Sequence, residues 1–145
     1  MQLFDLTGKV AIVTGGSRGI GRAIVALFAD EGAAVTFFYR GNDAAAQEVV
    51  AAARAAGHEV NCAQVDVTDA TACAAAVEQF ADRAGRIDVL VNNAGVIRDN
   101  PLAALDDDDI KAVLDTNIGG VFNMSRAVVP YMVMQRAGTI INMSS

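Results

Sequence analysis

The stretch that decides the fold of this chain is Thr14-Gly15-Gly16-Ser17-Arg18-Gly19-Ile20-Gly21. It joins an apolar run, Val10–Thr14, to a segment with the apolar spacing of a helix, Ile20–Glu31. A strand that enters a helix through a glycine-rich turn points free N–H groups and about half a positive charge at one place, which suits a pyrophosphate. The glycine spacing is Gly-x-x-x-Gly-x-Gly rather than the general Gly-x-Gly-x-x-Gly. Taken alone, the stretch therefore predicts either a dinucleotide site or an ordinary glycine turn.

Outward from this turn, strands and helices alternate along the rest of the chain. The apolar patterns and turn residues predict further strands at Ala34–Tyr39, Glu59–Val65, Ile87–Asn92 and Thr139–Met143. They predict helices from Asn42 to Gly57, at Asp69–Arg83, and from about Asp107 to Gln135, the last kinked or broken at Pro130. Alternation implies right-handed crossovers, so we expect an α/β fold, a Rossmann-type doubly wound parallel sheet with strand order 3-2-1-4-5. Residues 1–145 read as one domain.

Composition narrows the class of partner. The net charge of −6 disfavours nucleic acid as a partner, and no run of Lys and Arg predicts binding to an anionic membrane surface. No run of apolar residues is long enough to predict a membrane span. Met1–Lys9 lacks a signal core, and Cys62 and Cys73 form no CxxC motif, so the sequence predicts a cytoplasmic protein with reduced thiols. Four consecutive carboxylates, Asp106–Asp109, are explained by helix capping, and no metal site is expected.

Further motifs follow the predicted strands. Asn92-Asn93-Ala94-Gly95 follows the fourth strand, Asp66-Val67-Thr68 the third, and Asp115-Thr116-Asn117 lies in the last helix. With the glycine stretch and Ile140-Ile141-Asn142-Met143-Ser144-Ser145, they resemble the short-chain dehydrogenase/reductase family over the whole chain. Arg98-Asp99-Asn100 is similar to the branch that reduces 3-oxoacyl-[acyl-carrier-protein], although acetoacetyl-CoA reductases look similar there too.

This resemblance implies a role for each motif. Gly15, Gly16, Ser17, Arg18, Gly19, Ile20 and Gly21 would wrap the cofactor phosphates, Asp66 and Val67 would flank the adenine, and Asn93, Ala94 and Gly95 would line the ribose side. Ser145 would hydrogen-bond the substrate carbonyl, and Asn117 would hold a water in a proton relay. Arg136 matches a basic position that docks the acidic carrier protein; the alternative is a cation favoured at a helix end.

The end of the second predicted strand bears on the choice between NAD and NADP. Tyr39 stands where an NAD site places a carboxylate, and Arg40 follows it. Arg40 and Arg18 together can clamp a 2′-phosphate, so NADP(H) is the predicted cofactor; the alternative for Arg40 is a solvated arginine at a strand end.

The general acid of the family, a Tyr in a Tyr-x-x-x-Lys motif after the serine, is not in this sequence. Its two tyrosines, Tyr39 and Tyr131, are not followed by a lysine four positions later. We therefore expect this chain to be the amino-terminal part of a longer enzyme. The 145 residues alone are expected to be inactive, and the full-length enzyme is expected to be a homotetramer. The expected reaction is NADPH-dependent reduction of a 3-oxoacyl thioester on acyl carrier protein or CoA. The alternatives are an acetoacetyl-CoA reductase, another short-chain dehydrogenase, or a non-catalytic dinucleotide-binding module if the chain ends at Ser145.

Overall fold

A five-stranded parallel sheet forms the centre of the molecule. The computed structural model describes residues 4–144, and its strand order is β3-β2-β1-β4-β5, as the alternation of elements predicts. All four neighbouring pairs run parallel. The strands are β1 (Val10–Thr14), β2 (Ala34–Tyr39), β3 (Val60–Gln64), β4 (Val89–Asn92) and β5 (Thr139–Asn142).

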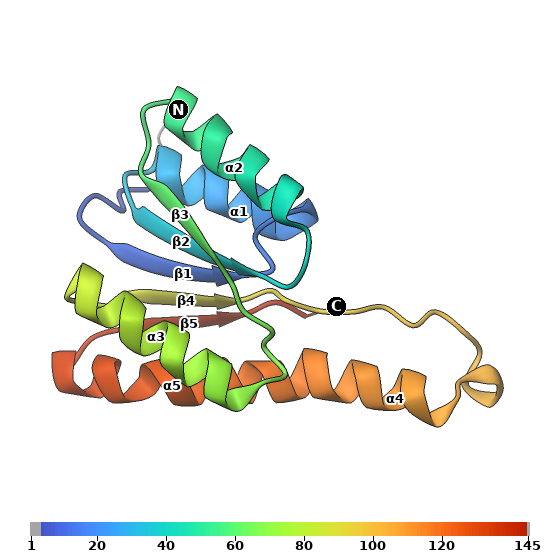
Figure 1. Cartoon of the computed structure of the whole chain (residues 1–145). Helices are drawn as coiled ribbons and strands as arrows, with labels where there is room; N and C mark the ends of the chain where they lie inside the picture. The colour runs from blue at the N-terminus through green and yellow to red at the C-terminus, as the bar shows by residue number, and fades with distance from the viewer. Residues whose placement is uncertain (1–3, 145) are drawn as a thin grey trace.

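Helices cover both faces of this sheet (Figure 1). α1 (Gly19–Asp30) and α2 (Asp43–Ala55) lie on one face, and α3 (Ala70–Ala84) and α5 (Gly120–Gln135) on the other. Alternate residues of β1 serve the two cores: Ile12 packs with the α3 and α5 side, and Val13 with the α1 and α2 side. A strand buried on both faces must be apolar throughout, which explains the run Val10–Thr14.

The long helix predicted from Asp107 to Gln135 is interrupted, but not at Pro130. α4 (Asp107–Val113) passes into a π-helical turn, Leu114–Gly119, and α5 then continues through Pro130 to Gln135. The expected break at Pro130 is wrong because the proline lies on the exposed side, where water can bond the carbonyl that it leaves free. Buried Val128 and Met132 hold the helix to the core on either side of it.

Polar side chains cap the amino termini of α2, α3 and α4. Asn42 accepts a hydrogen bond from the Ala45 N–H at the start of α2, and Asp69 accepts one from the Ala72 N–H at the start of α3. Asp106 accepts one from the Asp109 N–H at 2.8 Å, which confirms a capping role within the acidic run. Within residues 4–144 no group of three or more His, Cys, Asp or Glu is placed to hold a metal ion. Nor does any helix in that range have the length and apolar character needed to cross a membrane.

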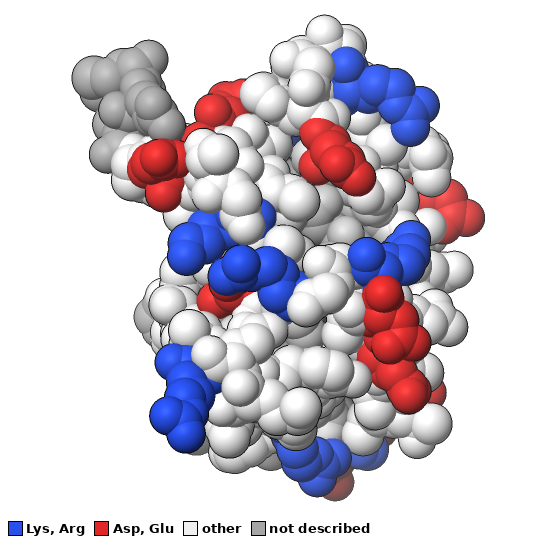
Figure 2. Space-filling view, turned by 90° about the vertical axis from the view of Figure 1, so that its left-hand side faces the viewer, with Lys and Arg blue, Asp and Glu red and all other residues white. Residues whose placement is uncertain are grey.

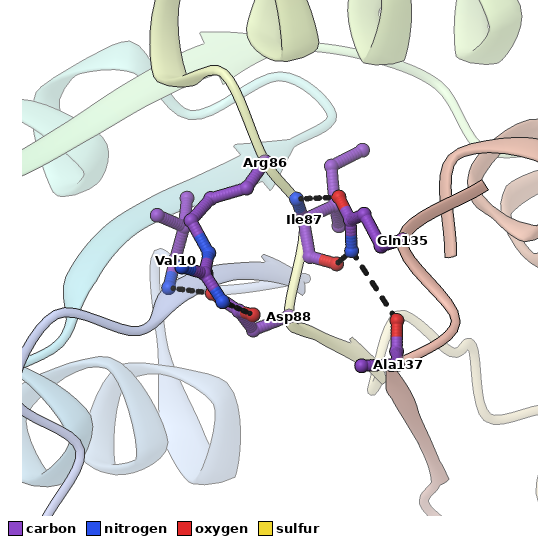
Figure 3. Close-up of polar contacts among 6 residues, drawn as sticks. All are labelled: Val10, Arg86, Ile87, Asp88, Gln135 and Ala137. Carbon is purple, nitrogen blue, oxygen red and sulfur yellow. Dashed lines mark hydrogen bonds and ion pairs between the residues drawn. The ribbon is translucent and has the colours of Figure 1, made fainter. Parts of the chain in front are cut away.

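An ion pair between a buried carboxylate, Asp88, and a half-exposed arginine, Arg86, fixes the amino-terminal end of β4 (Figure 3). Asp88, only 7% exposed, receives two bonds from the Arg86 guanidinium at 2.8 and 2.6 Å and one from the Val10 N–H at 2.9 Å. Burial raises the pKa of Asp88, but the bonds from Arg86 and Val10 outweigh it and hold this pKa below its ordinary value. Beside it, Gln135 bonds both main-chain groups of Ile87 and so ties the end of α5 to the start of β4.

The face formed by the amino-terminal ends of the strands carries charges of both signs. Figure 2 shows acidic and basic side chains interspersed over it, without one sign dominating. The charges of Arg86 and Asp88 pair within the molecule. The cleft described next lies at the opposite edge of the sheet, at the carboxyl-terminal ends of the strands.

Candidate functional site

A cleft of about 700 Å³ opens where β1, β2 and β4 end. This is the point at which the strand order reverses between β1 and β4, where open parallel sheets bind their ligands. Of the residues predicted to hold a cofactor, the following line it: Gly15, Ser17, Arg18, Gly19, Ile20, Tyr39, Arg40, Asp66, Val67, Asn93, Ala94 and Gly95. Four motifs that are far apart in the sequence therefore meet in one cleft.

The amino terminus of α1 is open toward this cleft. Its first position is preceded by Arg18, whose side chain makes no capping hydrogen bond, and its first turn carries no acidic residue. α2, α3 and α4 are all capped by Asn or Asp side chains. The uncapped N–H groups and the helix dipole together suit a phosphate.

The glycines of the turn divide into two kinds. Gly15 and Gly19 have φ of +69° and +55°, the left-handed region that glycine adopts without strain, and both line the cleft. Gly16 and Gly21 do not line it. A Cβ on Gly16 would lie 2.4 Å from Phe37 Cβ, and one on Gly21 would lie 2.0 Å from the Gly15 carbonyl oxygen. These two glycines permit close packing behind the site.

Thr14 joins the glycine turn to the turn after β4. Its buried hydroxyl oxygen accepts hydrogen bonds from the main-chain N–H groups of Asn93 and Ala94, each at 3.0 Å. The Asn93 side chain in turn donates to the carbonyl oxygens of Thr14 and Gly15, each at 3.2 Å. Sequence reasoning missed Thr14, although its place at the end of the strand that leads into the glycine turn was a usable signal.

Asn117 holds the main chain beyond that turn rather than lining the cleft. Its side-chain oxygen accepts from the Val96 N–H at 2.8 Å, and its side-chain nitrogen donates to the Val96 carbonyl at 3.0 Å. Asn117 lies in the π-helical turn, and its neighbour Thr116 and its partner Val96 both line the cleft. The geometry makes Asn117 a positioning residue for the chain after Gly95; its expected role in a proton relay stays a prediction.

At the other side of the cleft, Tyr39 and Arg40 have different surroundings. The Tyr39 ring packs against Phe37 with 6.3 Å between ring centres, and a hydrogen bond with the Asp43 carboxylate raises the pKa of Tyr39. The Arg40 side chain is 71% exposed, and its Nε lies 3.6 Å from Asp66 Oδ2. Burial raises the pKa of Asp66, but hydrogen bonds from Thr68 and the charge of Arg40 outweigh it and keep this pKa below its ordinary value.

Some residues that line the cleft were not predicted, and of the predicted site residues that the structure describes, Gly16, Gly21, Asn117 and Arg136 do not line it. The unpredicted ones adjoin the motifs in sequence: Phe38, Gly41, Asn42, Val65, Val96, Ile97 and Thr116. Arg136 is exposed and ends α5 with φ +54°, directly after the Gln135 that binds the start of β4. It therefore lies at the edge of the sheet opposite the cleft. Ser145 lies outside the described residues.

Comparison with known proteins agrees with this geometry. The family model described as short chain dehydrogenase matches residues 9–145. A 3-oxoacyl-[acyl-carrier-protein] reductase of Staphylococcus aureus is 43% identical over 137 residues, which are 94% of this chain and 56% of that protein. One from Thermotoga maritima is 42% identical over 143 residues, covering 97% of this chain and 56% of the relative.

Solved structures give the same result. A short chain dehydrogenase from Burkholderia cenocepacia in complex with NADP superimposes with a TM-score of 0.82 at 43% identity, over 87% of this chain and 51% of that one. A putative short-chain dehydrogenase/reductase from Burkholderia xenovorans reaches 0.89 at 38% identity, over 93% and 55%. This chain thus spans a little over half the length of the relatives it matches. On its motifs, its fold and its matched residues, the chain belongs to the short-chain dehydrogenase family of oxidoreductases.

Proposed function

We propose that this chain binds NADPH and supplies the cofactor-binding part of an enzyme that reduces 3-oxoacyl thioesters to their 3-hydroxyacyl forms. The observation that carries the proposal is the cleft itself, in which an uncapped helix terminus and two arginines, Arg18 and Arg40, converge. The similarity to 3-oxoacyl-[acyl-carrier-protein] reductases supports the substrate class.

The preference for NADPH over NADH is argued from charge. No acidic side chain ends β2; Tyr39 stands there, and Arg40 follows it with an exposed guanidinium. Arg18 adds a second cation in the glycine turn. A hydrogen bond to a charged group contributes about 1.5–3 kcal/mol, so each good contact with a 2′-phosphate favours NADPH about ten- to hundredfold. The solved NADP complex of a relative supports this assignment.

Replacing Arg40 by alanine is expected to weaken NADPH binding about ten- to hundredfold while leaving NADH binding unchanged, because only NADPH carries the 2′-phosphate. Calorimetric titration of both cofactors into the wild type and Arg40→Ala measures this. Arg54→Ala is the matched control, since Arg54 is an exposed arginine in the last turn of α2 that does not line the cleft. Equal affinities of the wild type for NADPH and NADH would refute the proposed cofactor.

Reduction of the substrate carbonyl needs a hydride donor for its carbon, and a hydrogen-bond donor and a proton donor for its oxygen. Bound NADPH supplies the hydride. Asn117 positions the chain at Val96, on the wall of the cleft. We propose that Ser145 donates a hydrogen bond to the carbonyl oxygen and so stabilises the charge that develops on it. The proton would come from the family's Tyr-x-x-x-Lys motif, which these residues do not contain.

The 145-residue chain is expected to oxidise NADPH with acetoacetyl thioesters only very slowly, because loss of a positioned acid typically lowers a rate about 10²–10⁴-fold. Spectroscopic assays with acetoacetyl-CoA and an acetoacetyl-carrier protein measure this, and the same assays on the product of the complete coding sequence are the comparison. An ordinary enzymatic rate from the 145 residues would mean that another residue supplies the proton. If the complete coding sequence encodes no Tyr-x-x-x-Lys motif, the alternative of a non-catalytic binding module is favoured.

The partners and location of the whole protein are also proposals. We infer an acyl carrier protein or CoA as the carrier, with Arg136 a candidate docking residue, and a cytoplasmic homotetramer at full length. Large apolar side chains on the outside of α5 support oligomerisation: Phe122 is 70%, Val133 67% and Met134 85% exposed.

A further inference from the structure

The last residue of β3 and a residue in the turn after it hold Arg40 at two points. Gln64 Nε2 donates a hydrogen bond to the Arg40 carbonyl oxygen at 2.9 Å, and Asp66 Oδ2 lies 3.6 Å from Arg40 Nε. Asp66 is itself fixed, because its other carboxylate oxygen accepts from the Thr68 main chain at 3.0 Å and from the Thr68 hydroxyl at 2.8 Å.

Arg40 needs such support because the sheet stops just before it. The paired register of β2 and β3 ends at Tyr39 and Gln64, and the Val65 N–H bonds the Tyr39 carbonyl. Arg40 is therefore the first residue beyond the paired residues of β2, and it is followed by Gly41. The Gln64 side chain binds the carbonyl oxygen of Arg40, which lies beyond that ladder.

We propose that Gln64 is a positioning residue that sets the preference between phosphorylated and unphosphorylated dinucleotides by fixing the main chain of Arg40. This inference rests on the proposed function, in which Arg40 binds the 2′-phosphate. Gln64 does not line the cleft, so it acts through Arg40 and not on the cofactor. A long, exposed arginine loses conformational entropy when it binds a phosphate, and an ordered main chain reduces that loss.

Of Gln64, Asp66 and Thr68, Gln64 is the residue whose effect on Arg40 can be tested separately. Asp66 lines the cleft and carries a charge, so changing it alters the contacts and the field around any ligand. Thr68 acts on Arg40 only through Asp66. Gln64 is neutral and exposed, and its side chain donates only to Arg40 among the hydrogen bonds found in residues 4–144.

The test is titration of NADPH and NADH into Gln64→Leu, which keeps the bulk of the side chain and removes its donor. We expect about fivefold weaker NADPH binding, the effect of one neutral hydrogen bond, and unchanged NADH binding. Combined with Arg40→Ala, Gln64→Leu should cause no further change in NADPH affinity. Gln47→Leu is the matched control: Gln47 is an exposed glutamine on α2 whose side chain approaches Cys62 instead of Arg40.

The outcomes separate this inference from the function on which it rests. A wild type that prefers NADPH, with Gln64→Leu showing the same preference, overturns the role of Gln64 and leaves the cofactor proposal standing. An equal loss of affinity for both cofactors indicates a merely structural role and also overturns it. A wild type without preference for NADPH overturns both.

Discussion

Gly21→Ala is expected to lower the free energy of unfolding by about 3 kcal/mol and to abolish detectable NADPH binding. The added Cβ would lie 2.0 Å from the Gly15 carbonyl oxygen and 2.5 Å from Asn93 Nδ2. The first of these atoms belongs to the main chain and cannot rotate away, so α1 must move from the turn at Gly15, and such overpacking costs about 1–3 kcal/mol or more. Moving α1 also displaces its open amino terminus, where the phosphates would bind.

Two other glycines serve as controls for this variant. Gly19 has open space around it but a φ of +55°, so Gly19→Ala should cost only the strain of a left-handed residue, about 1 kcal/mol. Gly41 has neither a close neighbour nor a positive φ, so Gly41→Ala should leave stability nearly unchanged. Denaturant unfolding measures the stability of all three variants, and cofactor titration is applied to Gly21→Ala alone, because Gly19 and Gly41 themselves line the cleft. A Gly21→Ala protein as stable as Gly41→Ala would show that α1 and the turn at Gly15 are not in close contact.

The fold could be predicted because its signals are local. The five strands and the order 3-2-1-4-5 follow from apolar runs, from turn residues and from the handedness of the crossovers. The cleft could be predicted because each of its motifs follows a strand, and parallel strands end at one edge of the sheet. Even so, the exact ends of β3 and the π-helical turn at Leu114–Gly119 were not predicted, because they depend on packing between elements.

What the sequence did not reveal are the contacts that hold the motifs together. The Thr14 hydroxyl accepts hydrogen bonds from main-chain groups 79 and 80 positions away. The Gln64 side chain, at the end of β3, donates to the carbonyl of Arg40 just beyond the neighbouring strand β2. Thr14 opens the glycine-rich stretch, but the sequence does not indicate a partner for its hydroxyl, and Gln64 belongs to no motif. Both contacts exist only because the strand order makes β1 a neighbour of β4, and β2 a neighbour of β3. Asn117 was predicted as a site residue, but its bonds to Val96 required the fold.

Thr14→Val is expected to destabilise the protein by about 2 kcal/mol and to weaken binding of both NADPH and NADH. Valine has nearly the shape of threonine but accepts no hydrogen bond, so the N–H groups of Asn93 and Ala94 lose their shared acceptor. A partly buried donor left without a partner costs about 1–3 kcal/mol, and both donors here lie beside the cleft, where water can replace part of the loss.

Thr14→Ser separates the hydrogen bonds from the packing. Serine keeps the hydroxyl and removes only a methyl group, so we expect a loss of about 1 kcal/mol and nearly unchanged cofactor affinity. Asn93, Ala94 and Gly95 line the cleft, and the resemblance places them beside the ribose and not beside the 2′-phosphate. Thr14→Val should therefore weaken the binding of NADPH and NADH equally, in contrast to Arg40→Ala and Gln64→Leu. Denaturant unfolding and paired titrations measure these effects. A valine variant that matches the serine variant in both measurements would mean that the turn after β4 keeps its conformation without the Thr14 hydroxyl. The bonds from the Asn93 side chain to the Thr14 and Gly15 carbonyl oxygens would then be enough to hold it.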